Sequence, residues 1–350
     1  MEKILVGLSG GVDSAVSAYL LKEQWYDVTA GFMINYLADE WEDCPTREDI
    51  KVAREVAQFL DIPFFIFDYR EEYEKKVLDY MYEWYKNGVT PNPDIMCNSE
   101  IKFRVFLDEA LELGYDKIAT GHYAQIKEKD WYFHLKKWVD VLKDQSYFLA
   151  WLSQDQLSKS IFPIGHIDKS EVRKIAQDIG LPNALRKDSQ WICFVGKVNM
   201  ADFLEKKIQP KNWNIVDTEW NILGIHKWVF YFTVWQRKWL DFWWQKEPMF
   251  VIKKDILNNE IVVWNSKDLW LYSQELHIEK MHFLWERSDI QFPLVAKAKV
   301  RYRQNDQECS IEKNNDWFIV KFIDQQRAIA SWQVCTIYQD NILIMSWVIN

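Results

Sequence analysis

Apolar runs and helical patterns alternate along the first half of the chain. Four short apolar runs, bounded by polar residues or glycine, predict buried parallel strands at residues 3–8, 28–34, 63–67 and 117–120. Apolar residues at helical spacing predict helices at 46–60, 72–86 and 101–113, and further along at 170–179 and 199–206. This alternation predicts an α/β fold with a doubly wound parallel sheet, whose site lies at the carboxyl ends of the strands.

The hydrophobic pattern changes after about Pro210, where short runs of β-forming residues replace the helices. A chain of 350 residues is long enough for two or three domains. We therefore expect an α/β domain at 1–205, a small central β-rich domain at 206–270 and a C-terminal β-barrel at 271–350.

The first predicted strand leads directly into the sequence SGGVDS at residues 9–14, where a helical pattern begins. A glycine turn at a helix N-terminus presents unpaired N–H groups and a positive dipole end, which together favour an anion such as phosphate. Asp13 would repel that phosphate unless a divalent cation lies between them, so we expect magnesium at Asp13. The GK[ST] ending of a Walker A loop is absent. The alternative interpretation is an ordinary helix cap.

The bulk composition argues against several classes of protein. The net charge of −9 argues against general electrostatic binding of nucleic acid, but it allows a local basic patch. Without a signal peptide or an apolar stretch long enough to span a bilayer, we expect a soluble cytoplasmic protein with no membrane contact. The five cysteines are scattered without a CxxC pair, so neither a disulfide framework nor structural zinc is expected.

One candidate for the basic patch is a strand-like run in which Lys297, Lys299, Arg301 and Arg303 alternate with apolar residues. A period of two places the four cations on one face of a strand. We expect this face to follow the phosphates of a nucleic acid, with the lysines at 136–137 extending it. The alternative is a solvated edge strand whose charges prevent aggregation.

Tryptophan is unusually frequent and glycine unusually rare, with 20 Trp against 11 Gly and no glycine after Gly224. Several tryptophans occupy turn positions that normally need glycine. One is Trp131, which follows Asp130 between two strand-like runs, where Asp-Gly would form a hairpin. We interpret most of these tryptophans as glycines in the organism, read from a UGA codon that its genetic code assigns to glycine. A true tryptophan-rich surface is the alternative.

Two segments carry cysteines in settings that suit chemistry. In PNPDIMCN, residues 91–98, two prolines keep the chain irregular, so that Asp94 and Cys97 are presented from a loop just before a helix. A cysteine there tends towards the nucleophilic thiolate, whereas the neighbouring carboxylate suits proton transfer. In ICFVG, residues 192–196, Cys193 lies in an apolar segment beside glycine. The alternative for each is a buried structural cysteine.

Six motifs occur in order along the chain: SGGVDS, PNPDIMCN, ATGHYA, KDQSYFL, KDSQxICFVG and TVxQRKxL. Together they resemble the bacterial tRNA-specific 2-thiouridylases, members of the N-type ATP pyrophosphatase superfamily, and the resemblance covers essentially the whole chain. It implies an adenine nucleotide alpha hydrolase-like catalytic domain and ATP-dependent 2-thiolation of the wobble uridine of tRNA. Where the chain departs from this family, the change is almost always from glycine to tryptophan.

The resemblance also implies roles for the residues that match the family motifs. Cys193 would carry a persulfide supplied by a sulfur-relay protein or a cysteine desulfurase. Cys97 would pair with it in a transient disulfide, and Asp94 would be the acid or base. ATP would be bound by Gly7, Leu8, Ser9, Gly10, Gly11, Val12, Asp13, Ser14, Met33 and Gly121. Transfer RNA would be contacted by Asn92, Pro93, Asp94, His122, Lys143, Asp144, Gln145, Arg301, Tyr302 and Gln333.

Two other functions share parts of this pattern. A pyrophosphatase-loop ligase or amidotransferase would share SGGVDS, but it would have no use for both cysteine motifs. An inactive RNA-binding protein could retain the whole fold. Incorporation of sulfur into tRNA distinguishes an enzyme from such a protein.

Overall fold

The structure is a computed structural model of the chain. It describes residues 1–37, 45–140, 143–187, 200–209, 212–226, 229, 232, 234, 236, 249–255, 258, 260–265, 272–285, 290–315, 317–327 and 329–349. The predicted persulfide cysteine, Cys193, lies outside these residues, and so do Cys44 and most of the tryptophan-rich segment 235–244. Among the helices of the described part, none is long and apolar enough to cross a membrane.

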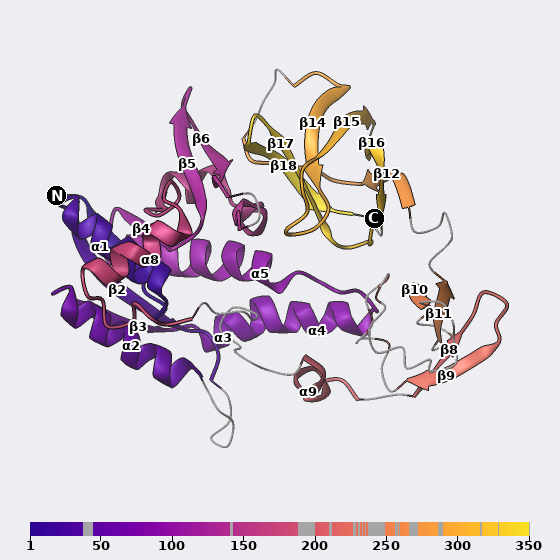
Figure 1. The fold of residues 1–350 in the computed structure, drawn as a ribbon, viewed down its shortest axis with the longest axis horizontal. Helices are drawn as coiled ribbons and strands as arrows, with labels where there is room; N and C mark the ends of the chain where they lie inside the picture. The colour runs from indigo at the N-terminus through magenta and orange to yellow at the C-terminus, as the bar shows by residue number, and fades with distance from the viewer. Residues whose placement is uncertain are drawn as a thin grey trace.

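The N-terminal part is built on a five-stranded parallel sheet of order β3-β2-β1-β4-β7. Figure 1 labels β2, β3 and β4 of this sheet. Its strands are β1 (Lys3–Gly7), β2 (Asp27–Ile34), β3 (Phe64–Asp68), β4 (Lys117–Ala119) and β7 (Ser160–Ile161). The central strand β1 is completely buried from Ile4 to Val6. Such burial is expected where helices cover both faces of a sheet. The predicted doubly wound sheet is confirmed, and its four predicted strands match to within one residue at each end.

Helical elements lie between these strands along the chain and also follow the last of them, β7. They are α1 (Val12–Glu23), α2 (Pro45–Phe59), α3 (Arg70–Tyr73), η1 (Glu74–Leu78), α4 (Asp79–Lys86), α5 (Pro93–Met96), η2 (Cys97–Val105), α6 (Phe106–Glu112), η3 (Ser146–Leu149), α7 (Gln154–Ser158), α8 (Lys169–Asp178) and α9 (Met200–Glu205). Ile4 and Val6 face one core with α1, α2 and α8, while Leu5 faces another with α4, η2 and α6. The two cores are the two faces of the sheet, because side chains alternate along a strand.

The helix predicted at 101–113 begins eight residues earlier, at Pro93, and continues through α5, η2 and α6. Asp94 and Cys97 therefore lie within the helical stretch. The prediction that a loop before the helix presents them is wrong. The reason is local: Pro93 occupies the first helical position and the side chain of Asn92 caps the helix. The η2 segment is π-helical.

The remaining strands form two further sheets. The central sheet has the order β10-β11-β8-β9 and contains β8 (Trp213–Val216), β9 (Ile222–His226), β10 (Met249–Asp255) and β11 (Glu260–Asn265). The C-terminal sheet contains β5 (Ala124–Lys129), β6 (Tyr132–Lys137), β12 (Tyr272–Ile278), β13 (His282–Phe283), β14 (Leu294–Lys299), β15 (Gln307–Asn314), β16 (Trp317–Arg327), β17 (Val334–Gln339) and β18 (Ile342–Val348). The predicted β-rich second half is confirmed.

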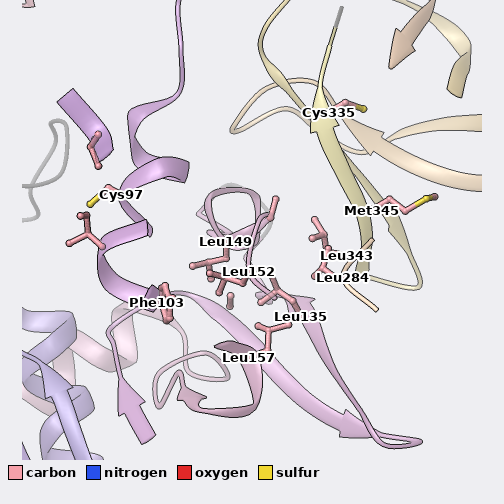
Figure 2. Packing of buried hydrophobic residues seen from close by; sticks show 14 of the residues in the cluster. Cys97, Phe103, Leu135, Leu149, Leu152, Leu157, Leu284, Cys335, Leu343 and Met345 are labelled. Carbon is pink, nitrogen blue, oxygen red and sulfur yellow. The ribbon is translucent and has the colours of Figure 1, made fainter. Parts of the chain in front are cut away.

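The C-terminal sheet includes a hairpin from the N-terminal part of the chain. β6 pairs with β18 through Ile342 and Lys136, so the β5–β6 hairpin continues the sheet of the barrel. Figure 2 shows Leu135 and Leu149 of the N-terminal part facing Leu284 and Leu343 of the barrel. One continuous hydrophobic core therefore joins the two parts.

A buried ion-pair cluster reinforces the same junction. Lys299 on β14 lies 3.5 Å from Asp144 and 3.8 Å from Asp306, and Lys137 on β6 pairs with the same Asp306. Lys137, Lys299 and Asp144 are at most 3% exposed. Burial lowers the pKa of Lys137, an effect that Asp306 partly offsets. Two cations against two carboxylates leave the cluster neutral, which limits the cost of burying these charges.

Replacement of Lys299 by methionine is expected to destabilise the protein by about 3 to 5 kcal/mol, because Asp144 would stay buried without its cation. Urea unfolding measures this loss. The matched control is Lys321→Met, which breaks a 2.8 Å pair with Glu312 on the surface and should cost less than about 1 kcal/mol. Equal losses in the two variants would contradict a structural role for the cluster.

The predicted basic stripe is wrong. β14 ends at Lys299, whose side chain is buried in the ion-pair cluster, and Arg303 has a φ of 65° in the turn that follows. Lys137, its predicted extension, is buried in the same cluster. Alternation along the chain could not reveal this, because the acidic partners of the two lysines are distant in sequence. Lys297 and Arg301 remain exposed.

Four tryptophans adopt backbone conformations that favour glycine. Within the described part, ten non-glycine residues have positive φ, and four of them are Trp25, Trp131, Trp220 and Trp332, at 65° to 72°. Their indoles are exposed, and that of Trp131 is 93% exposed. Residues with a Cβ are strained in this region, whereas glycine is not.

Two of these positions are standard glycine sites. Trp25 follows α1, and its N–H donates to the carbonyl of Lys22 at 3.0 Å, as a glycine at a helix C-terminus does. Asp130 and Trp131 both have positive φ in the two-residue turn between β5 and β6, as Asp-Gly does in a hairpin. These conformations support the interpretation that the organism reads these codons as glycine. Trp138 differs, because it is buried and its indole donates to the carbonyl of Ile167.

Candidate active site

The nucleotide loop, residues 8–14, follows β1 at the carboxyl end of the central strand and includes the first residues of α1. Two serines brace it. The Ser14 hydroxyl donates to the carbonyl of Gly11 at 3.0 Å and accepts from the N–H of Ser9 at 3.2 Å. Gly10 has a φ of 77°, in the left-handed region that glycine adopts without strain. No side chain caps the N-terminus of α1, so its first N–H groups can serve an anion.

The other residues predicted to bind ATP surround this loop. A Cβ on Gly121 would lie 2.8 Å from the backbone of Asp13 and Ser14, so the chain after β4 passes directly against the loop. A Cβ on Gly7 would lie 3.2 Å from the terminal methyl of Met33. Because β1, β2 and β4 are adjacent and parallel, their carboxyl ends bring these residues to one edge of the sheet.

Replacing Gly121 by alanine is expected to displace the nucleotide loop, since the new methyl would overlap backbone that has no room to move aside. We expect ATP affinity to fall roughly 10- to 100-fold, which corresponds to an overpacking cost of about 1 to 3 kcal/mol. Calorimetric titration with ATP measures it. The control is Gly114→Ala, whose Cβ meets no atom within 4 Å. Gly114→Ala should lower the stability of the protein and leave its ATP affinity unchanged. An equal loss of ATP affinity in this control would contradict a specific effect of Gly121 on the nucleotide loop.

Asp13 is held by neighbours on the protein side. The Tyr123 hydroxyl donates to its carboxylate at 2.6 Å, and the ammonium of Lys169 lies 3.6 Å away. In the part of the chain that the structure describes, no group of three acidic, His or Cys side chains could hold a metal ion. The described residues therefore do not by themselves form a resident magnesium site. Asp13 could supply one oxygen to a magnesium ion otherwise held by nucleotide phosphates.

The predicted catalytic residues of the second motif lie where the helical stretch begins. The Asn92 side chain accepts a hydrogen bond from the N–H of Ile95 at 3.3 Å and fixes the first turn. Asp94 is partly exposed, whereas Cys97 is 1% exposed and belongs to the core cluster, at the side away from Cys335 (Figure 2). Cys97 is also the first residue of η2, and π-helical segments are frequent at functional sites. Its pairing with Cys193 stays a prediction.

Three distant segments meet at this helical stretch. Ile95, Tyr147 and Val334 form one small buried cluster, and the Tyr147 hydroxyl donates to the carbonyl of Val334 at 2.9 Å. Phe148 and Tyr302 pack against the cluster with their ring centroids 4.3 Å apart. The barrel therefore touches the chain between Asp94 and Cys97.

A second contact joins the same parts. The side-chain amide of Gln333 donates to the carbonyl of Thr90 at 3.0 Å, two residues before Asn92. Arg301, next to Tyr302, is an exposed residue of the barrel. Its guanidinium donates to the carbonyl of Arg327, and the partial burial of this group, together with the charge of Arg327, lowers the pKa of Arg301. The structure thus brings predicted tRNA contacts of the barrel close to the predicted catalytic segment.

His122 lies in the interior. It is 9% exposed between the rings of Phe103 and Phe162, and its Nδ1 is 2.7 Å from the Thr120 hydroxyl. Burial holds the pKa of His122 well below its ordinary value, so the ring is neutral at physiological pH. A charged contact from this histidine to a tRNA phosphate therefore has no support in the structure.

The predicted contacts at 143–145 differ in exposure. The carboxylate of Asp144 is buried, accepting from the N–H of Trp138 at 3.1 Å and from the Ser146 hydroxyl at 2.8 Å. This carboxylate belongs to the buried ion-pair cluster at the junction with the barrel and does not face solvent. Gln145 is partly exposed and accepts from the backbone of Tyr123 at 2.9 Å. Lys143 is exposed, so its ammonium can reach a nucleic acid.

Sequence reasoning missed Tyr123, Lys169 and Asp306. Tyr123 follows His122 in the ATGHYA motif, so a signal for it was present. Lys169 begins α8 and Asp306 immediately precedes β15, and neither belongs to a local motif. Their partners are distant in sequence, which only the fold can reveal.

A parallel sheet with a glycine-containing loop after its central strand, followed by two β-rich parts, is the architecture of the HUP-domain class. Three family profiles match the chain in this order. They are described as a tRNA methyl transferase HUP domain at residues 2–197, a tRNA methyl transferase PRC-barrel domain at 201–265 and an aminomethyltransferase beta-barrel domain at 273–349.

Relatives named tRNA-specific 2-thiouridylase MnmA are similar over nearly full lengths. The protein of Christiangramia forsetii is 40% identical over 100% of both chains. Those of Pseudomonas savastanoi and Shouchella clausii are 41% and 42% identical, over 100% and 99% of this chain and 94% and 96% of their own. A solved structure, the U34-tRNA thiolase NcsA from Methanococcus maripaludis, is 22% identical with a TM-score of 0.37, over 59% of this chain and 66% of its own. The chain belongs to the family of tRNA-specific 2-thiouridylases, which are tRNA sulfurtransferases.

Proposed function

We propose that this protein replaces the 2-oxygen of the wobble uridine of tRNA with sulfur, at the expense of ATP. The observation that carries the proposal is the meeting of Tyr302 and Gln333 of the barrel with the segment that contains Asp94 and Cys97. A site of this kind lets one nucleic acid touch the barrel and the predicted catalytic residues together. The 2-oxygen belongs to a base that stacks on its neighbours in the tRNA, so the uridine has to be turned out of the stack to be reached.

ATP serves to activate the base. The uracil 2-oxygen attacks the α-phosphorus, AMP becomes bonded to that oxygen, and pyrophosphate leaves. The N–H groups of the nucleotide loop lie at the N-terminus of α1, where they would stabilise the charge of the phosphates. Magnesium, when bound with the nucleotide, would neutralise part of that charge, with Asp13 as its one carboxylate ligand.

Sulfur is then exchanged for the activated oxygen. The outer sulfur of a Cys193 persulfide attacks C2, and AMP leaves with the original oxygen. Cys97 attacks the inner sulfur of Cys193, so that a Cys97–Cys193 disulfide forms and the outer sulfur stays on the base as a thiocarbonyl. In the alternative order, Cys97 first releases sulfide, which then attacks C2. Asp94, three residues before Cys97, would take up or release the protons that these steps transfer. A thiol reductant would then reduce the disulfide and restore both cysteines.

The persulfide needs a donor, so we propose a sulfur-relay protein or a cysteine desulfurase as partner. Because its substrate is tRNA, we place the enzyme in the cytoplasm. We also propose a division into a catalytic domain at 1–205, a central domain at 206–270 and a tRNA-contacting barrel at 271–350.

Reconstitution tests the proposal. The protein is incubated with tRNA, ATP, magnesium and a sulfur source, and the nucleosides of the digested tRNA are analysed by mass spectrometry. We expect 2-thiouridine only when ATP and sulfur are both present. Tight binding of tRNA without any thiolated product would favour an inactive RNA-binding protein and contradict the proposal.

Binding of tRNA is expected to weaken with salt, because each neutralised phosphate releases a counterion. Replacing Arg301 by glutamine should lower the slope of log affinity against log salt by about 0.9, the amount for one phosphate contact. Filter binding at several salt concentrations measures the slope. The control is Lys321→Gln, an exposed cation elsewhere in the barrel that is paired with Glu312. An unchanged slope for Arg301→Gln would exclude a phosphate contact at this residue.

A further inference from the structure

Two side chains from outside the nucleotide loop hold one of its carbonyls. The carbonyl oxygen of Gly10 accepts a hydrogen bond from the amide of Asn183 at 2.9 Å and from the guanidinium of Arg186 at 3.1 Å. Asn183 is 4% exposed. Gly10 is also the residue at positive φ in this loop. A backbone oxygen that receives two side-chain donors, one of them charged, is held strongly in one direction.

The direction of this carbonyl decides what the loop presents to a ligand. In a trans peptide unit the C=O of one residue and the N–H of the next point in opposite directions. Holding the Gly10 carbonyl towards Asn183 and Arg186 therefore turns the N–H of Gly11 the other way, into the loop. There its bond to the Ser9 hydroxyl is long, 3.4 Å, and exposed, so a better acceptor can replace it. The reversed peptide would present an oxygen to an incoming phosphate and repel it.

The segment that carries the two donors is itself fixed. Arg173 on α8 donates to the carbonyl of Ala184 at 3.3 Å and to the carbonyl of Arg186. Arg186 also forms an ion pair with Asp49 on α2. A Cβ on Gly10 would lie 2.8 Å from the backbone oxygen of Asp49 and 2.9 Å from the guanidinium of Arg186. Three parts of the chain thus close around the Gly10 peptide and hold its carbonyl in this direction.

We propose that Asn183 and Arg186 are positioning residues for the pyrophosphate portion of ATP. They orient the Gly10–Gly11 peptide so that the Gly11 N–H meets a phosphate oxygen. The inference rests on the use of ATP in the proposed function. It assigns these two residues a role in binding the phosphates, although neither belongs to the nucleotide loop.

Titration calorimetry on the full chain with inorganic pyrophosphate and with AMP tests the proposal. Asn183→Leu keeps the size of the side chain and removes the donor. It is expected to weaken pyrophosphate binding about 10- to 100-fold, the range for one hydrogen bond to a charged group, here the bond from the Gly11 N–H to a phosphate oxygen. AMP binding should be unchanged. Arg186→Met should behave in the same way, whereas Arg186→Lys, which keeps a charged donor, should recover most of the affinity.

The matched control is Gln154→Leu, because the Gln154 amide also donates to two backbone carbonyls, those of Phe133 and Leu284, in another part of the fold. It should lower the melting temperature without changing pyrophosphate affinity. The proposal is overturned if Asn183→Leu binds pyrophosphate as the control does, or if it loses pyrophosphate and AMP affinity equally. The titrations need neither tRNA nor sulfur. Absence of thiolation by the unaltered protein would therefore count against the proposed function and not against this inference, whereas failure to bind pyrophosphate at all would overturn both.

Discussion

Replacing Cys97 with serine is expected to lower the rate of tRNA thiolation by at least about 10³-fold, the scale of losing a catalytic nucleophile. A serine hydroxyl cannot attack the sulfur of Cys193 and leave a disulfide, so turnover stops with sulfur still attached to the enzyme. Cys193→Ser should be equally inactive, since no persulfide can form. Affinity for tRNA should be retained in both variants, because the contacts of the barrel are unchanged. Thiolation is followed by nucleoside mass spectrometry, and affinity by filter binding.

Cys309 provides the matched control. It is buried in the barrel, where burial raises the pKa of its thiol to about 12, and its sulfur donates to the carbonyl of Ala296 at 3.4 Å. A serine at this position keeps that hydrogen bond, so Cys309→Ser should thiolate tRNA at a rate close to that of the unaltered protein. Full activity of Cys97→Ser or of Cys193→Ser would contradict the assignment of the catalytic pair.

Restoring glycine together at Trp25, Trp131, Trp220 and Trp332 is expected to stabilise the protein substantially. Each position holds a residue with a Cβ in the left-handed region, which costs about 1 to 2 kcal/mol. The four sites are far apart along the chain and lie in separate turns, so the gain should approach about 4 to 8 kcal/mol by addition. Urea unfolding of the fourfold variant and of the tryptophan-containing chain measures the difference.

A fourfold alanine variant separates the two causes of this gain. Alanine removes the exposed indoles but keeps the Cβ, so it should recover much less stability than glycine. Equal gains from alanine and glycine would show that exposed rings, and not backbone strain, were responsible. Mass spectrometry of peptides from the protein isolated from its organism addresses the genetic code directly. Tryptophan at these four positions would refute the reading of UGA as glycine.

The secondary structure of the first half could be predicted from the sequence, because its strands are short, apolar and separated by amphipathic helices. The start of the helix at Pro93 was placed too late, since two prolines suggested a loop. A proline at the first helical position and the cap from Asn92 favour a helix there instead. The short strand β7 was not predicted, because two residues carry no periodic signal.

The candidate site could be predicted wherever its residues are contiguous. Ser9 to Ser14 form an anion loop through their own backbone, so a local motif was sufficient. The alternating cations near Lys299 led to the wrong prediction of an exposed basic stripe, because their environment is not determined by contiguous residues. Their environment depends on Asp144 and Asp306, which reach Lys299 only after the hairpin and the barrel have joined.

The parallel sheet, the nucleotide loop at the end of its central strand, the family and the candidate cysteines can all be inferred from the amino-acid sequence. Each of these depends on short-range patterns or on motifs. Which predicted contacts face solvent depends on the packing of the folded chain, which buries Asp144, His122 and Lys299 and brings Gln333 to the segment before Cys97. The tertiary structure also revealed that Asn183 holds the nucleotide loop from more than 170 residues away. The physical reason is that burial and long-range hydrogen bonds are set by packing between segments, which no local pattern encodes.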